Sequence, residues 1–330
     1  MRDGFGRNLT YLRVSITDRC NLRCIYCMPE TGVRLVSHDD LLSFEEIERV
    51  VRVGVRLGIR AVRLTGGEPL MRRGIVDLVR RLASVDGIED LSMTTNGTRL
   101  GRLAPDLKAA GLRRVNISLD SLDPGTFAAI TRGGEIEGVL SGVDAALAIG
   151  LTPVKINCVP LRGLNDGDIP TLLEFIRDRP VHLRFIELMP VGWNDAWFQR
   201  RFMPASEIVT AVERAVSEKG GRAIHSTVVD GRGPATYLAI DGYKGTVGFI
   251  SALTGHFCAK CTRMRLTSTG SLSPCLASSA EVDLKGPMRG GCRDDELEDL
   301  FIKAASLKPV KHEMECAAGL DGRLMSRIGG

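Results

Sequence analysis

Short hydrophobic runs recur along the first 190 residues and alternate with longer stretches of helical periodicity. Runs of this length that are rich in β-branched residues and bounded by turn-forming residues are typical of buried strands. They predict six strands, at residues Tyr11–Thr17, Ala61–Thr65, Leu91–Thr95, Arg114–Asp120, Pro153–Val159 and His182–Leu188.

Helical periodicity fills the segments between these runs. Ser43 and Glu46 form the pattern of a capping box, which predicts a helix from that point to about Gly58. Two further segments keep the i, i+3, i+4, i+7 spacing of a buried helix face: Ile75, Leu78, Val79 and Leu82, and Ile169, Leu172, Leu173 and Ile176. Six strand–helix units in succession predict a parallel sheet, either doubly wound or curled into a barrel.

Polar residues occupy every second position in several of these strands, although a parallel sheet covered by helices on both faces has nearly continuous apolar strands. The polar set is Arg13, Ser15, Thr17, Arg63, Thr65, Asn116, Ser118, Asp120, Lys155 and Asn157. The helices require the apolar face, so the polar face is expected to line a concave, wet interior. The pattern therefore favours a six-stranded partial barrel that is open enough to hold ligands.

Three cations, Arg13, Arg63 and Lys155, belong to this inward set. Their natural counterpart is an anionic substrate, which charge-assisted hydrogen bonds would hold. The alternative is that some of them form buried ion pairs with Asp120 or Glu187. The substrate interpretation is favoured, because charged groups placed in a cleft are typical of functional sites.

The pattern changes after about residue 200. A helix at about Ser206–Lys219 precedes short strands near Ala223–Val229, Thr236–Ile240 and Thr246–Ile250. This order predicts a smaller α+β extension rather than a seventh and eighth strand–helix unit. The expected fold is α/β, with a partial (βα)6 barrel of the TIM type over residues 1–200 and the extension over residues 201–330.

Composition and charge exclude several classes of protein. No run of 18 or more apolar residues is present, and residues 1–6 lack the apolar core of a secretory signal, so a cytoplasmic location without membrane contact is expected. The net charge of +4 is small and evenly spread, which argues against nucleic acid as a partner. Nine cysteines in such a chain favour metal binding or catalysis over disulfides.

Three of these cysteines, Cys20, Cys24 and Cys27, form a CxxxCxxC run directly after the first predicted strand. In a parallel barrel, this loop lies at the C-terminal ends of the strands, where active sites are found. Three thiolates this close hold three irons of a [4Fe–4S] cluster and leave one iron open for a cofactor. Zinc is the alternative, but closed zinc sites need four ligands, and no fourth Cys or His follows nearby.

A second group consists of Cys258 and Cys261, followed by Cys275. It also has three cysteines without an obvious fourth, which predicts a second [4Fe–4S] cluster, although His256 makes zinc a competing interpretation. Arg263 and Arg265 alternate along a strand-like stretch beside this group. We expect them to bind the phosphates or base of a substrate; the alternative is a solvated edge.

Polar residues end the other strands of the predicted barrel as well. The second strand ends in the run Thr65-Gly66-Gly67-Glu68-Pro69, in which glycines let a ligand approach the backbone. The third and fourth strands end in Thr94-Thr95-Asn96-Gly97 and Ser118-Leu119-Asp120. Each motif alone is a common turn or cap, but together they predict a ring of polar groups around one face.

The CxxxCxxC run and the Gly-Gly-Glu-Pro motif resemble the signatures of the radical S-adenosylmethionine (SAM) superfamily. The chain is similar to the GTP 3′,8-cyclase family of that superfamily over nearly its full length. The resemblance rests on residues 12–29, 63–70, 114–120 and 257–267, and on a C-terminal Gly329-Gly330 tail. It implies that SAM on the N-terminal cluster yields a radical that takes hydrogen from ribose C3′ of GTP, after which C3′ bonds to guanine C8.

The family's contact residues carry over to matching positions of this sequence. The resemblance implies that SAM contacts Tyr26, Gly67, Ser118 and Met189, and that GTP contacts Arg13, Arg63, Thr94, Lys155, Arg263, Met264 and Arg265. It also implies guanine binding at the open iron of the second cluster, and a tail that threads into the active site. Thr262, Cys158 and Pro160 depart from the family pattern, and Cys292 and Cys316 match none of its ligand positions.

The expected partners are GTP, an electron donor of the flavodoxin or ferredoxin type, and the synthase that makes cyclic pyranopterin monophosphate from the product. The expected state is a monomer or homodimer. Two other functions compete with the cyclase: a different radical SAM enzyme with an auxiliary cluster, such as a peptide modifier, and a zinc-dependent interaction module. A zinc module does not explain the inward polar strands or the Gly-Gly-Glu-Pro motif.

Overall fold

The computed structural model describes residues 1–191, 195–225, 227–229, 233–314 and 325. Within these residues a 12-stranded sheet runs in the order β12-β11-β10-β1-β2-β3-β4-β5-β6-β9-β8-β7. The strands are β1 (Tyr11–Ser15), β2 (Ala61–Thr65), β3 (Asp90–Thr95), β4 (Arg114–Ser118), β5 (Val154–Cys158), β6 (Val181–Ile186), β7 (Ala223–His225), β8 (Thr236–Ile240), β9 (Thr246–Ile250), β10 (Arg263–Leu266), β11 (Ser271–Ser273) and β12 (Val282–Asp283).

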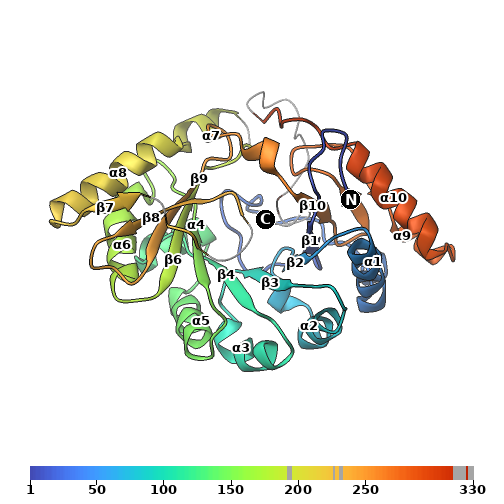
Figure 1. Cartoon of the computed structure of the whole chain (residues 1–330). Coiled ribbons are helices and arrows are strands. Elements are labelled where there is room, and N and C mark those ends of the chain that lie inside the picture. Colours follow the sequence, from blue (N-terminus) through green and yellow to red (C-terminus); the bar gives the residue numbers. More distant parts are fainter. Residues whose placement is uncertain (192–194, 226, 230–232, 315–324, 326–330) are drawn as a thin grey trace.

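Strands β1 to β6 are parallel neighbours in chain order, as the six strand–helix units predict. Figure 1 shows the sheet curved into an open arch, with helices on its outer side. The predicted α/β fold with a parallel core and a C-terminal extension is therefore confirmed. The division of the chain at residue 200 stays a prediction.

The helices bury their apolar faces against the convex side of the sheet. All eight residues of the two helical stripes predicted above are buried in the main hydrophobic core. The capping box is also present, because Ser43 accepts from the backbone N–H of Glu46 and Glu46 accepts from that of Ser43. The helices are α1 (Phe44–Arg56), α2 (Ile75–Ala83), α3 (Leu100–Ala109), α4 (Pro124–Thr131), α5 (Ile136–Ala148), α6 (Ile169–Arg177), α7 (Asp195–Arg201), α8 (Ala205–Glu218), α9 (Lys285–Arg289) and α10 (Asp294–Ser306).

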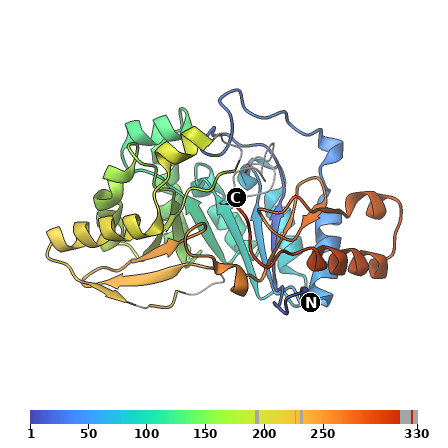
Figure 2. The ribbon, with the colours of Figure 1, turned by 90° about the horizontal axis from the view of Figure 1, so that it is seen from above.

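The C-terminal extension continues the sheet at both of its ends. Strand β9 pairs in parallel with β6, while β10 pairs in parallel with β1. The antiparallel strands β8 and β7 follow β9, and β11 and β12 follow β10. Edge strands expose unpaired backbone groups, so the extension covers both edges of the six-stranded barrel. Figures 1 and 2 place α8 and α10 at opposite ends of the curved sheet.

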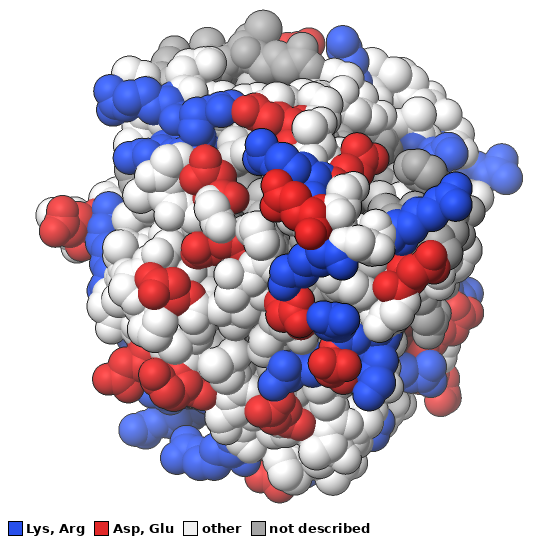
Figure 3. All heavy atoms as spheres, turned by 90° about the vertical axis from the view of Figure 1, so that its left-hand side faces the viewer, with Lys and Arg blue, Asp and Glu red and all other residues white. Residues whose placement is uncertain are grey.

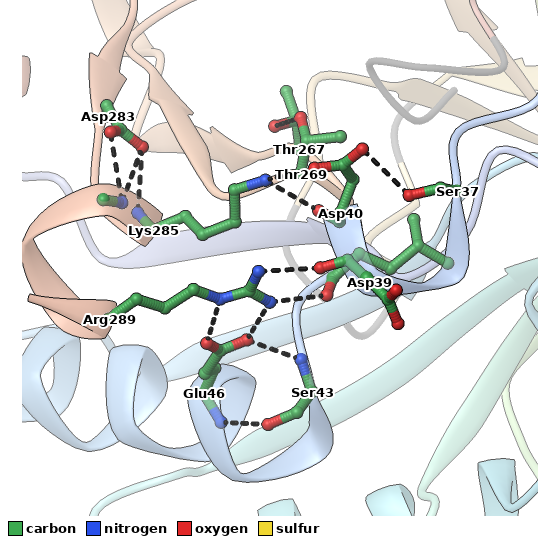
Figure 4. A network of polar contacts seen from close by, with 12 residues as sticks. Ser37, Asp39, Asp40, Ser43, Glu46, Thr267, Thr269, Asp283, Lys285 and Arg289 are labelled. Atoms are coloured by element: carbon green, nitrogen blue, oxygen red, sulfur yellow. Dashed lines mark hydrogen bonds and ion pairs between the residues drawn. The ribbon is translucent and has the colours of Figure 1, made fainter.

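Ion pairs fasten α9 to the segment that leads into α1 (Figure 4). Arg289 Nε lies 2.8 Å from Glu46 Oε1, and the same guanidinium donates to the carbonyl oxygens of Asp39 and Leu41. Lys285 Nζ lies 3.3 Å from Asp40 Oδ1. Most of these groups are partly exposed, so each pair contributes little stability, but together they fix the position of the returning chain.

Basic and acidic side chains are interspersed on the face that Figure 3 shows. Such mixing matches the small net charge of +4 and gives no single-sign patch on that face. Among the described residues, no helix is both long and apolar enough to cross a membrane.

The capping box yields a test of local stability. We expect Ser43→Ala to lower the free energy of unfolding by about 1 kcal/mol, because the Glu46 N–H loses its acceptor at the start of α1. Urea denaturation followed by circular dichroism measures this change. Ser217→Ala, at an exposed position of α8, is the control and is expected to leave stability unchanged. Equal stability of both variants would contradict a role for the cap.

Candidate active site

One cavity lies at the C-terminal ends of the parallel strands, and its lining includes all six cysteines of the two groups. Polar ends of β2 to β5 reach it through Thr65, Thr95, Ser118 and Asn157. This is the end of a parallel barrel at which active sites form. The sheet therefore brings together two cysteine groups that lie more than 230 positions apart in the chain.

Helix α4 supports the loop with Cys20, Cys24 and Cys27 through backbone hydrogen bonds. The backbone N–H groups of Arg23 and Ile25 donate to the carbonyl oxygens of Thr131 and Ile130, at 3.0 and 2.9 Å. Arg132 follows α4 in a left-handed conformation, and its Nη1 donates to the carbonyl oxygens of Arg23 and Met28. These contacts fix both sides of the loop.

The Gly-Gly-Glu-Pro motif packs directly on the backbone that precedes Cys20. A Cβ atom on Gly67 would lie 2.4 Å from the carbonyl oxygen of Arg19, and one on Gly66 would lie 2.5 Å from that of Thr17. The Gly67 N–H donates to Thr17 and the Glu68 N–H to Arg19, both at 2.7 Å. Only glycine fits such a close approach of two backbones.

Glu68 is buried and links this motif to the end of β3. Its carboxylate accepts from the Thr95 hydroxyl, the Asn96 N–H and the Leu70 N–H at 2.6–2.9 Å. Burial raises the pKa of Glu68 to about 7, although these hydrogen bonds act in the opposite direction. Asn96 then donates from Nδ2 to the Cys20 sulfur at 3.8 Å and to Asn21 Oδ1 at 2.9 Å.

Tyr26 connects the cysteine loop to β4. Its hydroxyl donates to Asp120 Oδ2 at 2.6 Å, and Asp120 Oδ1 accepts from the Val159 N–H. Burial raises the pKa of Asp120 to about 6, against the lowering effect of the hydrogen bonds from Tyr26 and Val159. Asp120 therefore ties the cysteine loop to the ends of β4 and β5.

Five arginines form the basic wall of the same cavity: Arg13, Arg63, Arg184, Arg263 and Arg265. Burial, followed by repulsion from Arg263, lowers the pKa of Arg265 to about 10, and burial also lowers that of Arg63 to about 10. Within the described part of the chain, Arg63 Nη2 and Arg184 Nε are buried without a hydrogen-bond partner. Buried donors of this kind favour an anionic ligand.

Asp120 and Glu187, the two carboxylates considered as alternative partners of the inward cations, accept hydrogen bonds from other groups. Glu187 accepts from the backbone N–H groups of Ala205, Leu253 and Thr254, and so caps the start of α8. Asp120 accepts from Tyr26 and Val159, as described above. Among the described residues, neither carboxylate forms an ion pair with Arg63, and the role of the inward cations as substrate ligands stays a prediction.

The second cysteine group is braced by two long-range basic residues. Arg7 donates from Nη1 to the Cys258 carbonyl oxygen at 2.9 Å, and Lys308 donates to the carbonyl oxygens of Arg263 and Pro274. Burial alone would raise the pKa of the Cys261 thiol, but the charges of Arg263 and Lys308 outweigh it and lower the pKa to about 7. Cys261 is therefore more readily deprotonated than an ordinary cysteine.

Most residues predicted from sequence lie at the cavity. Its lining includes Tyr26, Gly67, Ser118 and Met189 of the predicted SAM set, and Arg13, Arg63, Thr94, Arg263 and Arg265 of the predicted GTP set. Two residues are placed elsewhere. Met264 points to the other side of β10 and is fully buried in the main core, so its side chain does not line the cavity. Lys155 is buried with its Nζ 5.9 Å from the Tyr237 ring centroid, and it is not among the lining residues.

Sequence reasoning missed Arg184, Lys308 and His312, which also line the cavity. The alternation of His182, Arg184 and Ile186 in β6 carried the signal for Arg184. Lys308 and His312 follow α10 in irregular segments, where periodicity gives no orientation. His312 Nε2 lies 2.7 Å from the Ala252 carbonyl oxygen, and its ring faces His256 at 5.1 Å between centroids.

Three of the residues that do not match the family pattern make contacts within the fold. The Thr262 carbonyl oxygen accepts from the N–H groups of Thr10 and Tyr11 and so starts the β1–β10 pairing. Cys158 is buried with its sulfur 3.5 Å from the Asp120 carbonyl oxygen, and Cys292 packs against the main core. The Gly329-Gly330 tail and Cys316 lie outside the described residues.

Two family models together match most of the chain. The Radical SAM superfamily model matches residues 14–176, and the model named Molybdenum Cofactor Synthesis C matches residues 181–314. Relatives in Heliobacterium modesticaldum, Moorella thermoacetica and Pelotomaculum thermopropionicum, each named GTP 3′,8-cyclase, are 49%, 48% and 46% identical. Each of these alignments covers 100% of both chains.

The chain belongs to the GTP 3′,8-cyclase family. Its function is that of a radical SAM GTP 3′,8-cyclase in molybdenum cofactor synthesis, as the sequence motifs indicate. The peptide-modifier and zinc-module hypotheses are wrong, because relatives that match this chain over its full length are cyclases.

Two solved structures share the fold of this cyclase. Native anSMEcpe with bound AdoMet and the Cp18Cys peptide gives a TM-score of 0.58 at 15% identity, over 92% of this chain and 82% of that one. Streptococcus suis SuiB gives a TM-score of 0.58 at 15% identity, over 82% of this chain and 61% of that one. At this identity the likeness concerns the fold alone.

The close packing of Gly67 gives a prediction for the cofactor loop of the cyclase. We expect Gly67→Ala to abolish SAM cleavage, because the new Cβ would displace the Arg19 carbonyl and the loop that begins at Cys20. Anaerobic formation of 5′-deoxyadenosine measures this. Gly167→Ala, where nothing lies within 4 Å of the added Cβ, is the matched control. SAM cleavage at the wild-type rate by Gly67→Ala would show that the loop does not depend on this contact.

Proposed function

We propose that the two cysteine groups hold two [4Fe–4S] clusters at opposite sides of one cavity and that GTP binds between them. Support comes from the lining of the cavity, which combines both cysteine groups with five arginines. Three cysteines per group leave one iron of each cluster open, which suits the donor set. The open iron at Cys20, Cys24 and Cys27 takes SAM, and the one at Cys258, Cys261 and Cys275 takes the guanine.

When bound, the N-terminal cluster and SAM supply the radical that removes hydrogen from ribose C3′ of GTP, so that C3′ bonds to guanine C8. The protein positions both molecules. On the SAM side, the backbone at Gly67 approaches the cofactor closely, and Tyr26, Ser118 and Met189 surround it. The hydrogen bond from Tyr26 to Asp120 keeps the aromatic ring in place.

An apolar cluster beside the cysteine loops keeps water out of the cavity. It includes Leu188, Val191, Phe198, Leu253 and Met314, all buried. Partly buried residues packed against this cluster include Ile25, Tyr26 and Met189 from the SAM side and Leu276, which follows Cys275. Radical reactions require such exclusion of water, because solvent and other hydrogen donors compete for the reactive species.

On the GTP side, the basic wall holds the triphosphate, which carries about four negative charges near neutral pH. Arg13, Arg63, Arg263 and Arg265 donate to it, and Arg184 joins them from β6. Thr94 contacts GTP from the end of β3. Lys155 and Met264 belong to the binding set through the family resemblance alone, because neither is among the residues that line the cavity.

The remaining partners of the enzyme follow from its chemistry. A low-potential electron donor of the flavodoxin or ferredoxin type reduces the N-terminal cluster, and the synthase of cyclic pyranopterin monophosphate consumes the product. The enzyme acts in the cytoplasm, as a monomer or homodimer.

Anaerobic reconstitution with iron and sulfide tests the proposal directly. We expect about eight irons per chain, because each cysteine group holds four, and consumption of GTP together with SAM. Iron analysis and product chromatography measure both quantities. The triple variant Cys258→Ser, Cys261→Ser and Cys275→Ser is expected to retain about four irons. Wild-type protein that binds four irons or fewer would contradict the second cluster.

The basic wall gives a prediction about the substrate. We expect Arg263→Ala and Arg265→Ala each to lower kcat/KM for GTP roughly 10- to 100-fold, because a charge-assisted hydrogen bond contributes about 1.5–3 kcal/mol. Iron content is expected to stay at the wild-type value. Arg102→Ala, an exposed arginine of α3, is the control. If both wall variants turn over GTP like wild type, these arginines do not bind the substrate.

A further inference from the structure

Lys308 is a buried lysine that follows the end of α10. Only 3% of its surface is exposed, although lysine is rarely buried without a partner. Its Nζ donates to the Pro274 carbonyl oxygen at 2.6 Å and to the Arg263 carbonyl oxygen at 2.8 Å. Both acceptors are neutral, so these hydrogen bonds leave the charge of the ammonium group unbalanced.

The charged groups around Lys308 come from three parts of the chain. Arg7 and Arg263 repel its ammonium group, whereas Cys261 and Cys275 attract it in their thiolate forms. Within the described ranges, no carboxylate forms an ion pair with Lys308. A buried charge requires a counter-charge, and a thiolate-ligated cluster at the second cysteine group would supply it.

The two hydrogen bonds also join the two arms of this cysteine group. Arg263 lies two residues after Cys261, and Pro274 comes directly before Cys275, so the acceptors lie 11 positions apart in the sequence. Strands β10 and β11 already pair through Arg265 and Ser273. Lys308 bridges the two strands at the end of this hairpin that carries the cysteines. It thereby sets the distance between Cys261 and Cys275.

We propose that Lys308 is a positioning residue of the second cluster, with its ammonium group both tying the cysteine arms together and compensating the negative charge of the thiolate-ligated cluster. This inference rests on the proposed second cluster. A fixed positive charge stabilises the reduced, more negative state, and so it raises the reduction potential of a nearby cluster. None of the SAM or GTP contacts implied by the family involves Lys308.

Two substitutions distinguish the effect of the two Lys308 hydrogen bonds from the effect of its charge. Lys308→Gln keeps an N–H donor for the carbonyl oxygens but removes the charge, whereas Lys308→Met removes both. Lys308→Arg keeps the charge and the donors. Lys311→Met, which removes the same charge from an exposed position three residues later, is the matched control.

The experiment uses full-length, anaerobically reconstituted protein without GTP. Iron content is measured first, and an electron paramagnetic resonance titration then gives the potential of each cluster, with the N-terminal cluster as internal reference. We expect Lys308→Gln to keep about eight irons, with a more negative potential for the second cluster only. We expect Lys308→Met to lose the second cluster several-fold faster to a chelator, and Lys308→Arg and Lys311→Met to behave as wild type.

The possible outcomes are distinguishable. Wild-type potential and chelator resistance in both Lys308→Gln and Lys308→Met would overturn the inference while leaving the second cluster intact. Loss of helical circular dichroism or of both clusters in Lys308→Gln would also overturn it, because Lys308 would then support the fold as a whole. If wild-type protein itself lacks a second cluster, the proposed function fails, and the inference fails with it.

Discussion

Burial of several positive charges on the concave face of the sheet is the constraint on which the rest of the active site depends. Strand geometry turns alternate side chains to the concave face of the sheet, and the arginines of β1, β2, β6 and β10 line the cavity there. Two buried carboxylates, Glu68 and Asp120, lie beside the cysteine loop and accept from backbone and hydroxyl donors. The cavity thus has a basic region, formed by the arginines, and a separate region beside the cysteine loop that holds two buried carboxylates.

Strand pairing at both edges of the six-stranded core brings C-terminal residues to this cavity. Because β10 pairs with β1, the residues Arg263 and Arg265 lie beside Tyr11 and Arg13 in register. The second cysteine group therefore reaches the same cavity as the first, although it belongs to the C-terminal part of the chain. The parallel pairing of β6 with β9 covers the other edge and brings Ile250 and Ala252 to the cavity.

Sequence patterns predict much of this arrangement, and the exceptions have physical causes. Hydrophobic alternation places the six central strands within one or two residues of their observed ends, because side-chain orientation in strands follows local period. The same alternation indicates Arg13 and Arg63 correctly at the cavity. It cannot place Lys155, whose long side chain lies against Tyr237, a residue 82 positions later. The sequence also does not predict that β9 pairs with β6 or that β10 pairs with β1, because pairing between distant segments leaves no local pattern.

The attachment of Arg7 to the Cys258 carbonyl oxygen and to residues 309 and 310 has a consequence for biosynthesis. The loop with Cys20 receives its backbone hydrogen bonds from α4, and Arg132 directly follows that helix. The cysteine group at residue 258 needs the N-terminal segment, β1 and the chain beyond α10 at the same time. Nascent chains fold from the N-terminus, so the backbone supports of the first cysteine group form earlier in synthesis than the contacts that join Arg7 to the second group.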